Sequence, residues 1–167
     1  MKQCVVLLAF VAAACGGSGS DGSEPVAGEA ETAAAAAAPK ACNLLTRADA
    51  EKALGREVQQ LPNDGGPAGL DICQYGYQGE RMMDAGNASV TVQPVDIASL
   101  RKGVEEQGYA VEEVAGLGDS AFWSNDVGLY VGKGNRTAIY LVRVGGEGEA
   151  QSKERAIALA KATVARL

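Results

Sequence analysis

The chain has 167 residues, no His, and a formal net charge of −6 that results from 15 Lys and Arg against 21 Asp and Glu. This acidic balance argues against nucleic acid as a partner, because nucleic acid requires clustered positive charge. The lack of His removes His-ligated metal sites and nucleophiles that His activates. We therefore expect a protein that has no cofactor and is not an enzyme.

The first 14 residues have the pattern of a signal peptide. Lys2 precedes an apolar run over residues 5–14, which at about ten residues is too short to span a membrane but typical of a signal-peptide core. Three Ala residues then lead into Cys15, and this resembles a bacterial lipobox, in which the Cys carries diacylglycerol. Ala12 departs from that pattern, because Leu is more common there, and an ordinary Cys beside a conventional cleavage site is the alternative.

We expect the lipid on Cys15 to anchor the protein in the cell envelope, with the folded domain on the exported (periplasmic or extracellular) side. Residues 16–40 are rich in Gly and Ser and then in Ala, up to Pro39. Such a segment cannot bury a core, so residues 15–40 are interpreted as the lipidated Cys and a tether. Residues 41–167 are long enough for one folded domain. The sequence has no polybasic patch for anionic lipids, so the expected membrane contact is the lipid alone.

Four Cys residues are present. Cys4 leaves with the signal peptide and Cys15 takes the lipid, which leaves Cys42 and Cys73 in a compartment that permits disulfides. We expect these two to form one bridge. A metal or redox pair is the alternative, but zinc requires four ligands and the sequence has no Cys-x-x-Cys motif.

Capping residues predict three helices in the domain. Thr46, with Asp49 three residues later, marks the first as a capping-box variant. Asp96 is expected to cap a helix over residues 97–107, whose apolar stripe is Ile97, Leu100 and Val104. Ser152 is expected to cap the last helix. The last helix has small or apolar residues spaced for one packed face: Ala156, Leu159, Ala160, Thr163, Val164 and Leu167.

Apolar runs between turn residues predict the strands, and residues 88–93 alternate clearly between apolar and polar. The expected ranges are 57–60, 72–77, 88–93, 109–114, 120–123, 128–131 and 137–144. Residues 132–136 suit a reversal between the last two strands. Residues 137–144 are apolar on both sides, so this strand is expected to be covered on both faces. The order predicts an α+β fold with an antiparallel sheet of about six to seven strands flanked by about three helices.

Two stretches were considered as functional sites. Gly116-Leu117-Gly118-Asp119 has too few glycines for a phosphate loop and precedes a strand, so we interpret it as a turn. Several aromatic residues are candidates for lining a cleft between sheet and helix: Tyr75, Tyr77, Phe122, Trp123 and Tyr140. Packing of these side chains in the core is the simpler interpretation.

Four runs resemble a family of small bacterial lipoproteins that is catalogued as a domain of unknown function and is common in actinobacteria. They are CNLLTRADAEKALGREV (42–58), CQYGY (73–77), VAGLGDSAFW (114–123) and LYVGKGNRTAIYLVRV (129–144). The resemblance covers most of residues 41–167. It implies a cell-envelope lipoprotein with one disulfide, and some such proteins are similar to the PsbP-like α/β sandwich. It implies no catalytic residues.

Three functional hypotheses follow. The first is a membrane-tethered, non-enzymatic binding or accessory module whose partner is an envelope protein or a glycan. The second is a carrier of a small apolar or lipid-like ligand. The third is a hydrolase that uses acidic residues such as Asp119 and Asp126. We favour this hypothesis least, because the sequence has no recognisable set of residues that would act as a general base.

Overall fold

The computed structural model describes residues 40–62, 70–81, 84–125 and 127–167. These residues belong to one compact unit, Ala36–Leu167. The predicted signal peptide, Cys15, the tether up to Pro39 and Asp126 lie outside the described residues. Within the described part of the chain, no helix is long and apolar enough to cross a membrane.

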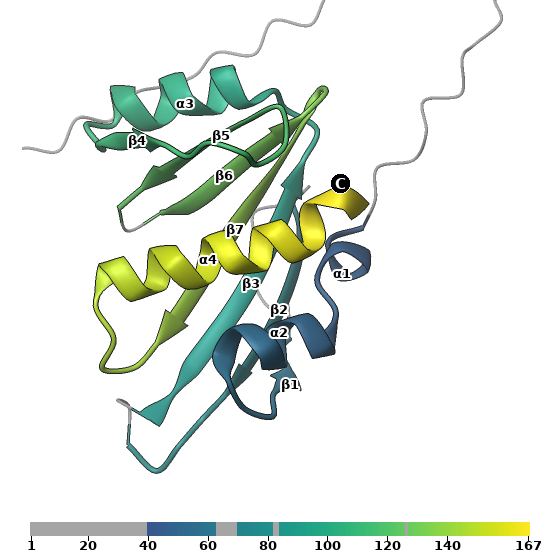
Figure 1. The fold of residues 1–167 in the computed structure, drawn as a ribbon, viewed down its shortest axis with the longest axis vertical. Coiled ribbons are helices and arrows are strands. Elements are labelled where there is room, and N and C mark those ends of the chain that lie inside the picture. Colours follow the sequence, from purple (N-terminus) through teal and green to yellow (C-terminus); the bar gives the residue numbers. More distant parts are fainter. Residues whose placement is uncertain (1–39, 63–69, 82–83, 126) are drawn as a thin grey trace, which may run out of the picture. The chain divides into compact units, whose positions relative to one another are not determined.

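The described strands form one antiparallel sheet in the order β1-β2-β3-β7-β6-β5-β4 (Figure 1). Their bounds are Gln59–Gln60 (β1), Asp71–Tyr77 (β2), Gly86–Gln93 (β3), Val111–Glu113 (β4), Ser120–Ser124 (β5), Gly128–Lys133 (β6) and Arg136–Val144 (β7). The strand that the sequence predicts to be covered on both faces, β7, lies in the middle of the sheet. The predicted α+β fold is confirmed, and the strands follow one another in the predicted order.

Helices cover both faces of this sheet (Figure 1). The helices are Ala41–Leu44 (α1), Arg47–Leu54 (α2), Ile97–Glu106 (α3) and Glu149–Thr163 (α4), and a 3₁₀ turn, Val164–Arg166, follows α4. Buried residues of α1, α2 and α4 share one core cluster with the sheet, whereas α3 forms a smaller cluster with other sheet residues. Three helices therefore lie on one face and α3 lies on the other.

The two clusters follow from the alternation of side chains along each strand. On β7, Ala138, Tyr140 and Val142 are fully buried in the larger cluster, together with Ala156, Leu159 and Ala160 of α4. On the opposite face, the predicted stripe of α3 packs against the stacked rings of Phe122 and Tyr130, whose centroids are 4.5 Å apart. Ile139 joins this smaller cluster, but Leu141 does not. The second face of β7 is therefore covered by α3 only as far as Ile139.

Local signals place the amino end of the domain. The Thr46 hydroxyl accepts from the Asp49 backbone N–H at 3.3 Å, and Asp49 Oδ2 accepts from the Thr46 backbone N–H at 3.1 Å, so the predicted capping box is confirmed. The predicted Cys42–Cys73 disulfide is also confirmed, with the two Cα atoms 4.9 Å apart, and it ties α1 to β2. The Ala41 backbone N–H donates to Asp71 Oδ2 at 2.8 Å beside it.

The predicted cap of the last helix is wrong. The helix begins one turn earlier, at Glu149, with Gly148 as the N-cap, and Ser152 lies in the first turns of α4. Gln151 Oε1 accepts from the Gly148 backbone N–H at 3.0 Å. A Gln at this position satisfies a free N–H at a helix start, and Glu, Ala and Gln are good helix formers, so the helix extends past the Ser.

Candidate functional site

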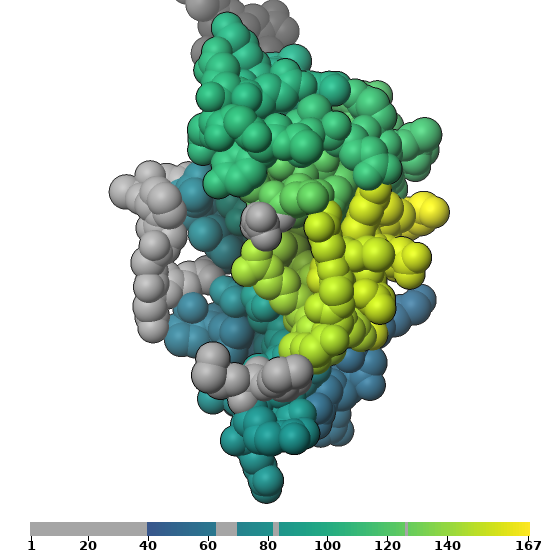
Figure 2. All heavy atoms as spheres, turned by 90° about the vertical axis from the view of Figure 1, so that its left-hand side faces the viewer, coloured from purple at the N-terminus to yellow at the C-terminus, as the bar shows by residue number. Residues whose placement is uncertain are grey.

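The candidate site is a surface pocket of about 670 Å³ near the carboxyl end of β7. On one side, β3 pairs with β7 as far as Gly86 opposite Val144. On the other side, the pairing with β6 ends earlier, at Leu129 opposite Tyr140. The pocket lies beside the part of β7 that still pairs with β3 but no longer pairs with β6. Figure 2 views the molecule from this side, with the yellow-green end of β7 between the green β5–β6 region and the teal β2–β3 region.

Five parts of the chain form the pocket wall. They are Leu61 after β1, the facing ends of β2 and β3, the β5–β6 hairpin, the end of β7 with the loop 145–148, and the first turns of α4. The residues used below are Leu61, Tyr77, Gln78, Asn87, Trp123, Gly128, Leu141, Arg143, Val144, Glu147, Glu149 and Ser152. Because these parts are distant in sequence, tertiary packing alone brings them together.

Trp123 connects the β5–β6 hairpin to α4. Its indole Nε1–H lies 3.1 Å from Asn125 Oδ1 and 3.2 Å from Glu149 Oε1, a shared hydrogen bond with two acceptors. The Trp side chain is only 3% exposed, so its ring supports the pocket wall more than it faces the solvent. Glu149 is the first residue of α4, where the helix dipole favours a negative charge.

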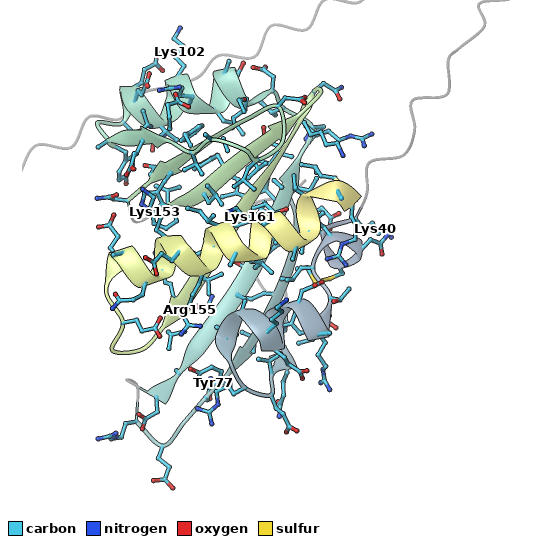
Figure 3. All side chains as sticks on the ribbon, viewed as in Figure 1. Lys40, Tyr77, Lys102, Lys153, Arg155 and Lys161 are labelled. Atoms are coloured by element: carbon cyan, nitrogen blue, oxygen red, sulfur yellow. A yellow bond between two sulfur atoms is a disulfide. The ribbon has the colours of Figure 1, made fainter. Side chains whose placement is uncertain are left out.

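Arg155 holds the loop 145–148 in place (Figure 3). Its Nε and Nη2 donate to the two carboxylate oxygens of Glu147 at 2.7 and 2.6 Å, a bidentate pair. Its Nη1 donates to the Ala53 carbonyl at 2.6 Å, near the end of α2, where helix carbonyls lack partners. The hydrogen bonds from Arg155 lower the pKa of Glu147, and those with Glu147 raise the pKa of Arg155. One guanidinium thus joins α4, the loop and α2.

Gly128 lets the start of β6 approach β7 closely at the point where the pairing of these two strands ends. Its φ is +126°, a conformation that favours glycine. A Cβ at this position would lie 2.5 Å from the Tyr140 carbonyl oxygen. A larger residue would therefore push the start of β6 away from β7 and change the pocket.

A second pocket, of about 910 Å³, lies beside the first. It is lined by residues of α2, β1 and the following turn, and it shares Leu61, Tyr77 and Gln78 with the first pocket. The Tyr77 ring has the Arg56 guanidinium 4.2 Å from its centroid. A Cβ at Gly86 would lie 2.8 Å from several Tyr77 ring atoms. Tyr77 is thus packed between neighbours and separates the two pockets.

The five aromatic candidates do not share one cleft. Tyr77 and Trp123 line the first pocket, whereas Tyr75 and Tyr140 are buried in the larger core cluster. Phe122 is on the opposite face, in the cluster with α3. The hypothesis of an apolar-ligand carrier, which relied on these five side chains, gains no support from their positions.

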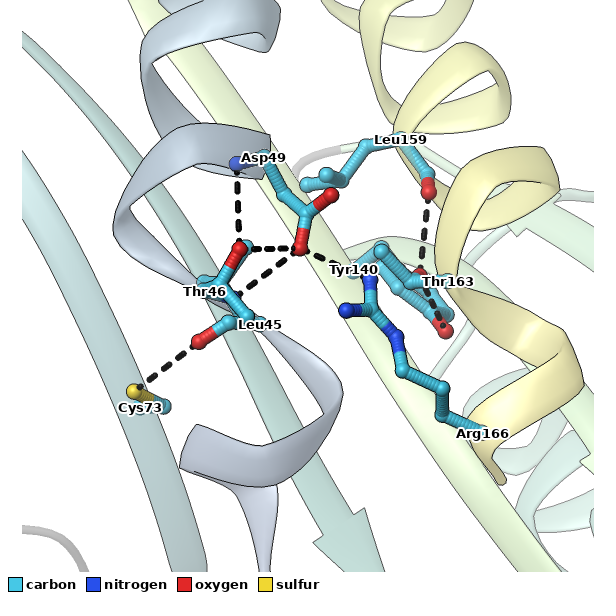
Figure 4. Close-up of polar contacts among 8 residues, drawn as sticks. All are labelled: Leu45, Thr46, Asp49, Cys73, Tyr140, Leu159, Thr163 and Arg166. Carbon is cyan, nitrogen blue, oxygen red and sulfur yellow. Dashed lines mark hydrogen bonds and ion pairs between the residues drawn. The ribbon is translucent and has the colours of Figure 1, made fainter.

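Tyr140 illustrates how such a ring is used in packing (Figure 4). The Thr163 hydroxyl lies 3.0 Å from the Tyr140 hydroxyl and 3.0 Å from the Leu159 carbonyl. The one hydroxyl proton of Thr163 is placed to donate to either acceptor, the Tyr140 hydroxyl or the Leu159 carbonyl. Burial raises the pKa of Tyr140 to about 12, although the bond to Thr163 opposes this shift.

The acidic candidates have structural surroundings where they are described. Asp119 Oδ2 accepts from the Gly134 backbone N–H at 2.7 Å, so it stabilises the turn between β6 and β7. Gly116 and Gly118 have positive φ, and the turn interpretation of residues 116–119 is confirmed. Asp126 lies outside the described residues. Within the described part, no group of three or more His, Cys, Asp or Glu side chains is placed to hold a metal ion.

Sequence reasoning missed Asn87, Glu149 and Ser152 as pocket residues. It also missed Arg155, which binds Glu147 of the pocket wall. The one local signal was the glycine-rich loop 145–148 before a helix, which is typical of many connections.

A comparison of the chain with protein-family models, with curated proteins and with solved structures finds no match.

Proposed function

We propose that the chain is an exported, lipid-anchored module that binds a ligand or partner of the cell envelope in the pocket at the end of β7, without catalysing a reaction. The observation that supports this proposal is that two carboxylates of the pocket wall are held by protein side chains. Glu147 is bound by Arg155, and Glu149 is bound by the Trp123 indole. These bonds fix the pocket before a ligand arrives, and a preformed pocket loses less entropy on binding.

The distance between Lys40 and the pocket is compatible with the same function. Lys40 precedes α1, and α1 lies beside the 3₁₀ turn that follows α4. The pocket residues Glu149 and Ser152 are in the first turns of α4, whereas Lys40 lies near the last turns (Figure 3), and a helix of 15 residues is about 22 Å long. Lys40 and the pocket therefore lie toward opposite ends of α4.

Site-specific photo-crosslinking in the native envelope tests the binding function. The photoreactive residue p-benzoylphenylalanine is placed at Ser152 in the pocket, with Cys15 intact, and at Gln107, the C-cap residue of α3, as a matched control. We expect an adduct of defined mass from position 152 and none of that mass from position 107. Equal adducts from both positions, or no adduct from position 152, would argue against a binding site in this pocket.

A separate variant tests the anchor. Cys15→Ser is expected to move the protein from the membrane fraction to the soluble fraction after cell lysis, because a thioether-linked lipid can no longer form. Unchanged membrane association of this variant would refute the lipidation proposal without affecting the pocket.

A further inference from the structure

One edge of β7 is open beyond the end of its pairing with β6. That pairing stops at Tyr140, whereas the pairing with β3 continues to Val144. Residues 141–144 therefore have a neighbouring strand on one side only. The first pocket lies along this open edge, because Leu141, Arg143 and Val144 line it together with Gly128 of β6.

The backbone hydrogen-bonding groups of β7 point alternately to its two edges, as in any antiparallel strand. The Gly145 backbone N–H donates to the Ala85 carbonyl at 2.8 Å, on the β3 side. By this alternation the backbone groups of Arg143 also point toward β3, and those of Val142 and Val144 point toward the open edge. The open edge thus presents the main chain of two residues to the pocket side of β7.

Three of these groups have no hydrogen-bond partner among the described residues: the N–H and C=O of Val142 and the N–H of Val144. The Val144 carbonyl accepts from the Glu147 backbone N–H at 3.1 Å. Val142 is fully buried, and buried backbone groups are nearly always paired, because an unpaired one costs free energy. An occupant that pairs with these groups would therefore gain affinity from them.

The order and spacing of the three groups are those of a strand edge. A donor and an acceptor on one residue, followed two residues later by another donor, match the acceptor, donor and acceptor of an antiparallel strand. A peptide that adds a strand to a sheet binds through its main chain in this way. A sugar hydroxyl pairs with one such group at a time, whereas an extended main chain repeats its donors and acceptors at this interval.

The pocket has room for the side chains of an added strand. On the face of the sheet that α4 covers, the pocket wall includes Trp123, Glu149 and Ser152. The residue opposite Val142 would point to this side, because paired residues of neighbouring strands share a face. On the other face, α3 does not extend over Leu141, so the adjacent residues of the peptide would lie beside Leu141 without a helix above them.

We propose that the open edge of β7 binds an extended peptide segment of a partner protein, which adds a short strand beside residues 142–144 through its main chain. Val144 is half-buried and lines the pocket, so the segment enters over Val144 and displaces the side chains that cover Val142. This inference rests on the proposed binding function and specifies the class of ligand.

Synthetic peptides test main-chain recognition on the mature chain, residues 15–167 with Cys15→Ser. The panel consists of four heptapeptides with alternating Thr and Val between terminal Lys residues, in which the central residue is Ala, Val, Leu or Tyr. Each has a matched form with N-methyl groups on the central residue and the next one, so neither edge keeps its central donor. We expect at least one peptide to bind with a dissociation constant of about 1 mM or below, and its N-methylated form to bind about tenfold more weakly.

Labelling with ¹⁵N-valine locates the binding. The amide signals of Val142 and Val144 should shift when the peptide is added, whereas the signal of Val104 in α3 should not.

Val144→Pro removes the unpaired N–H, and Val144→Ala keeps it. The Pro variant should bind the peptide about fivefold more weakly than the Ala variant, as expected for the loss of one hydrogen bond. Pro is tolerated in a strand where its N–H would face an open edge. The comparison with N-methylated peptides uses an unchanged β7, so it does not depend on the folding of either variant.

Failure of all four peptides to bind, equal affinity of the N-methylated forms, or shifts confined to other Val residues would overturn the strand addition. Equal affinity of folded Val144→Pro and Val144→Ala would do the same. A photo-adduct at position 152 that contains a glycan or a lipid would also overturn it, but would leave the proposed binding function standing. Absence of both the adduct and peptide binding would overturn both proposals.

Discussion

The Trp123 indole donates to Oε1 of Glu149 at 3.2 Å, which joins the end of β5 to the first residue of α4 across 26 positions of sequence. This contact bridges two walls of the candidate pocket. Because the indole N–H also has Asn125 as an acceptor, it keeps a hydrogen-bond partner when Glu149 is absent. The main effect of the bond to Glu149 is therefore to position the start of α4 against β5. The contact can therefore be removed without unfolding the protein.

Glu149→Ala should lower the free energy of unfolding by about 1 kcal/mol, because it removes a hydrogen bond and a favourable charge at the helix start. Glu149→Gln keeps an acceptor and should cost about half as much. Urea unfolding followed by Trp fluorescence measures both. Glu154→Ala, at an exposed position of the same helix, is the control, and an equal cost there would contradict a specific role for Glu149.

Arg155→Lys should loosen the loop 145–148. A Lys ammonium cannot form the bidentate pair with Glu147 and reach the Ala53 carbonyl at the same time. We expect a loss of about 1–2 kcal/mol in unfolding free energy and faster hydrogen exchange at the amides of the loop. Arg81→Lys is the control, because the Arg81–Asp84 pair is a surface contact with Arg81 79% exposed. Unchanged exchange in the loop would show that Glu147 does not depend on the guanidinium fork.

Stability should fall at high pH because of Tyr140. Its pKa in the folded protein is about 12, above the unfolded value of about 10. The neutral hydroxyl is thus favoured by folding, so this stability is complete below about pH 10 and is lost as the pH rises toward 12.

Tyr140→Phe isolates this effect, because it does not titrate. The wild-type protein should lose about 1 kcal/mol of unfolding free energy between about pH 8 and pH 11 that the variant does not lose. Burial also raises the pKa of Tyr130, but this residue is present in both proteins and its effect cancels. Parallel pH profiles of the two proteins would show that Tyr140 ionises as readily in the folded state as in the unfolded chain.

The Cys42–Cys73 bridge spans 31 positions, and the chain-entropy model assigns a loop of this size about 3–4 kcal/mol of stability. Reduction of the wild-type protein, or the double variant Cys42→Ala with Cys73→Ala, should lower the unfolding free energy by that amount. Denaturant titrations with and without reductant measure it. The double variant should not respond to reductant, and a wild-type midpoint that reductant leaves unchanged would contradict a stabilising bridge.

Local sequence signals predicted most of the elements. The Thr46–Asp49 capping box, the alternation in residues 88–93 and the stripe of α3 each involve residues a few positions apart, so the sequence displays them directly. The cap at Ser152 failed because two start signals compete in the same stretch, and Gln151 stabilises the earlier one. The sequence also contained an argument against one cleft lined by all five aromatic residues. Adjacent residues in a strand point to opposite faces, as Phe122 and Trp123 do.

The sequence by itself determined the order of the strands and of three helices, the caps of α2 and α3 and the one possible disulfide within the domain, because these depend on spacing, propensity and the number of Cys residues. Only the tertiary structure decided that β6 leaves β7 after Tyr140 while β3 continues to Val144. That separation brings Trp123 to Glu149 and creates the pocket. The pairing of distant strands depends on how the whole core packs, and no local pattern encodes it.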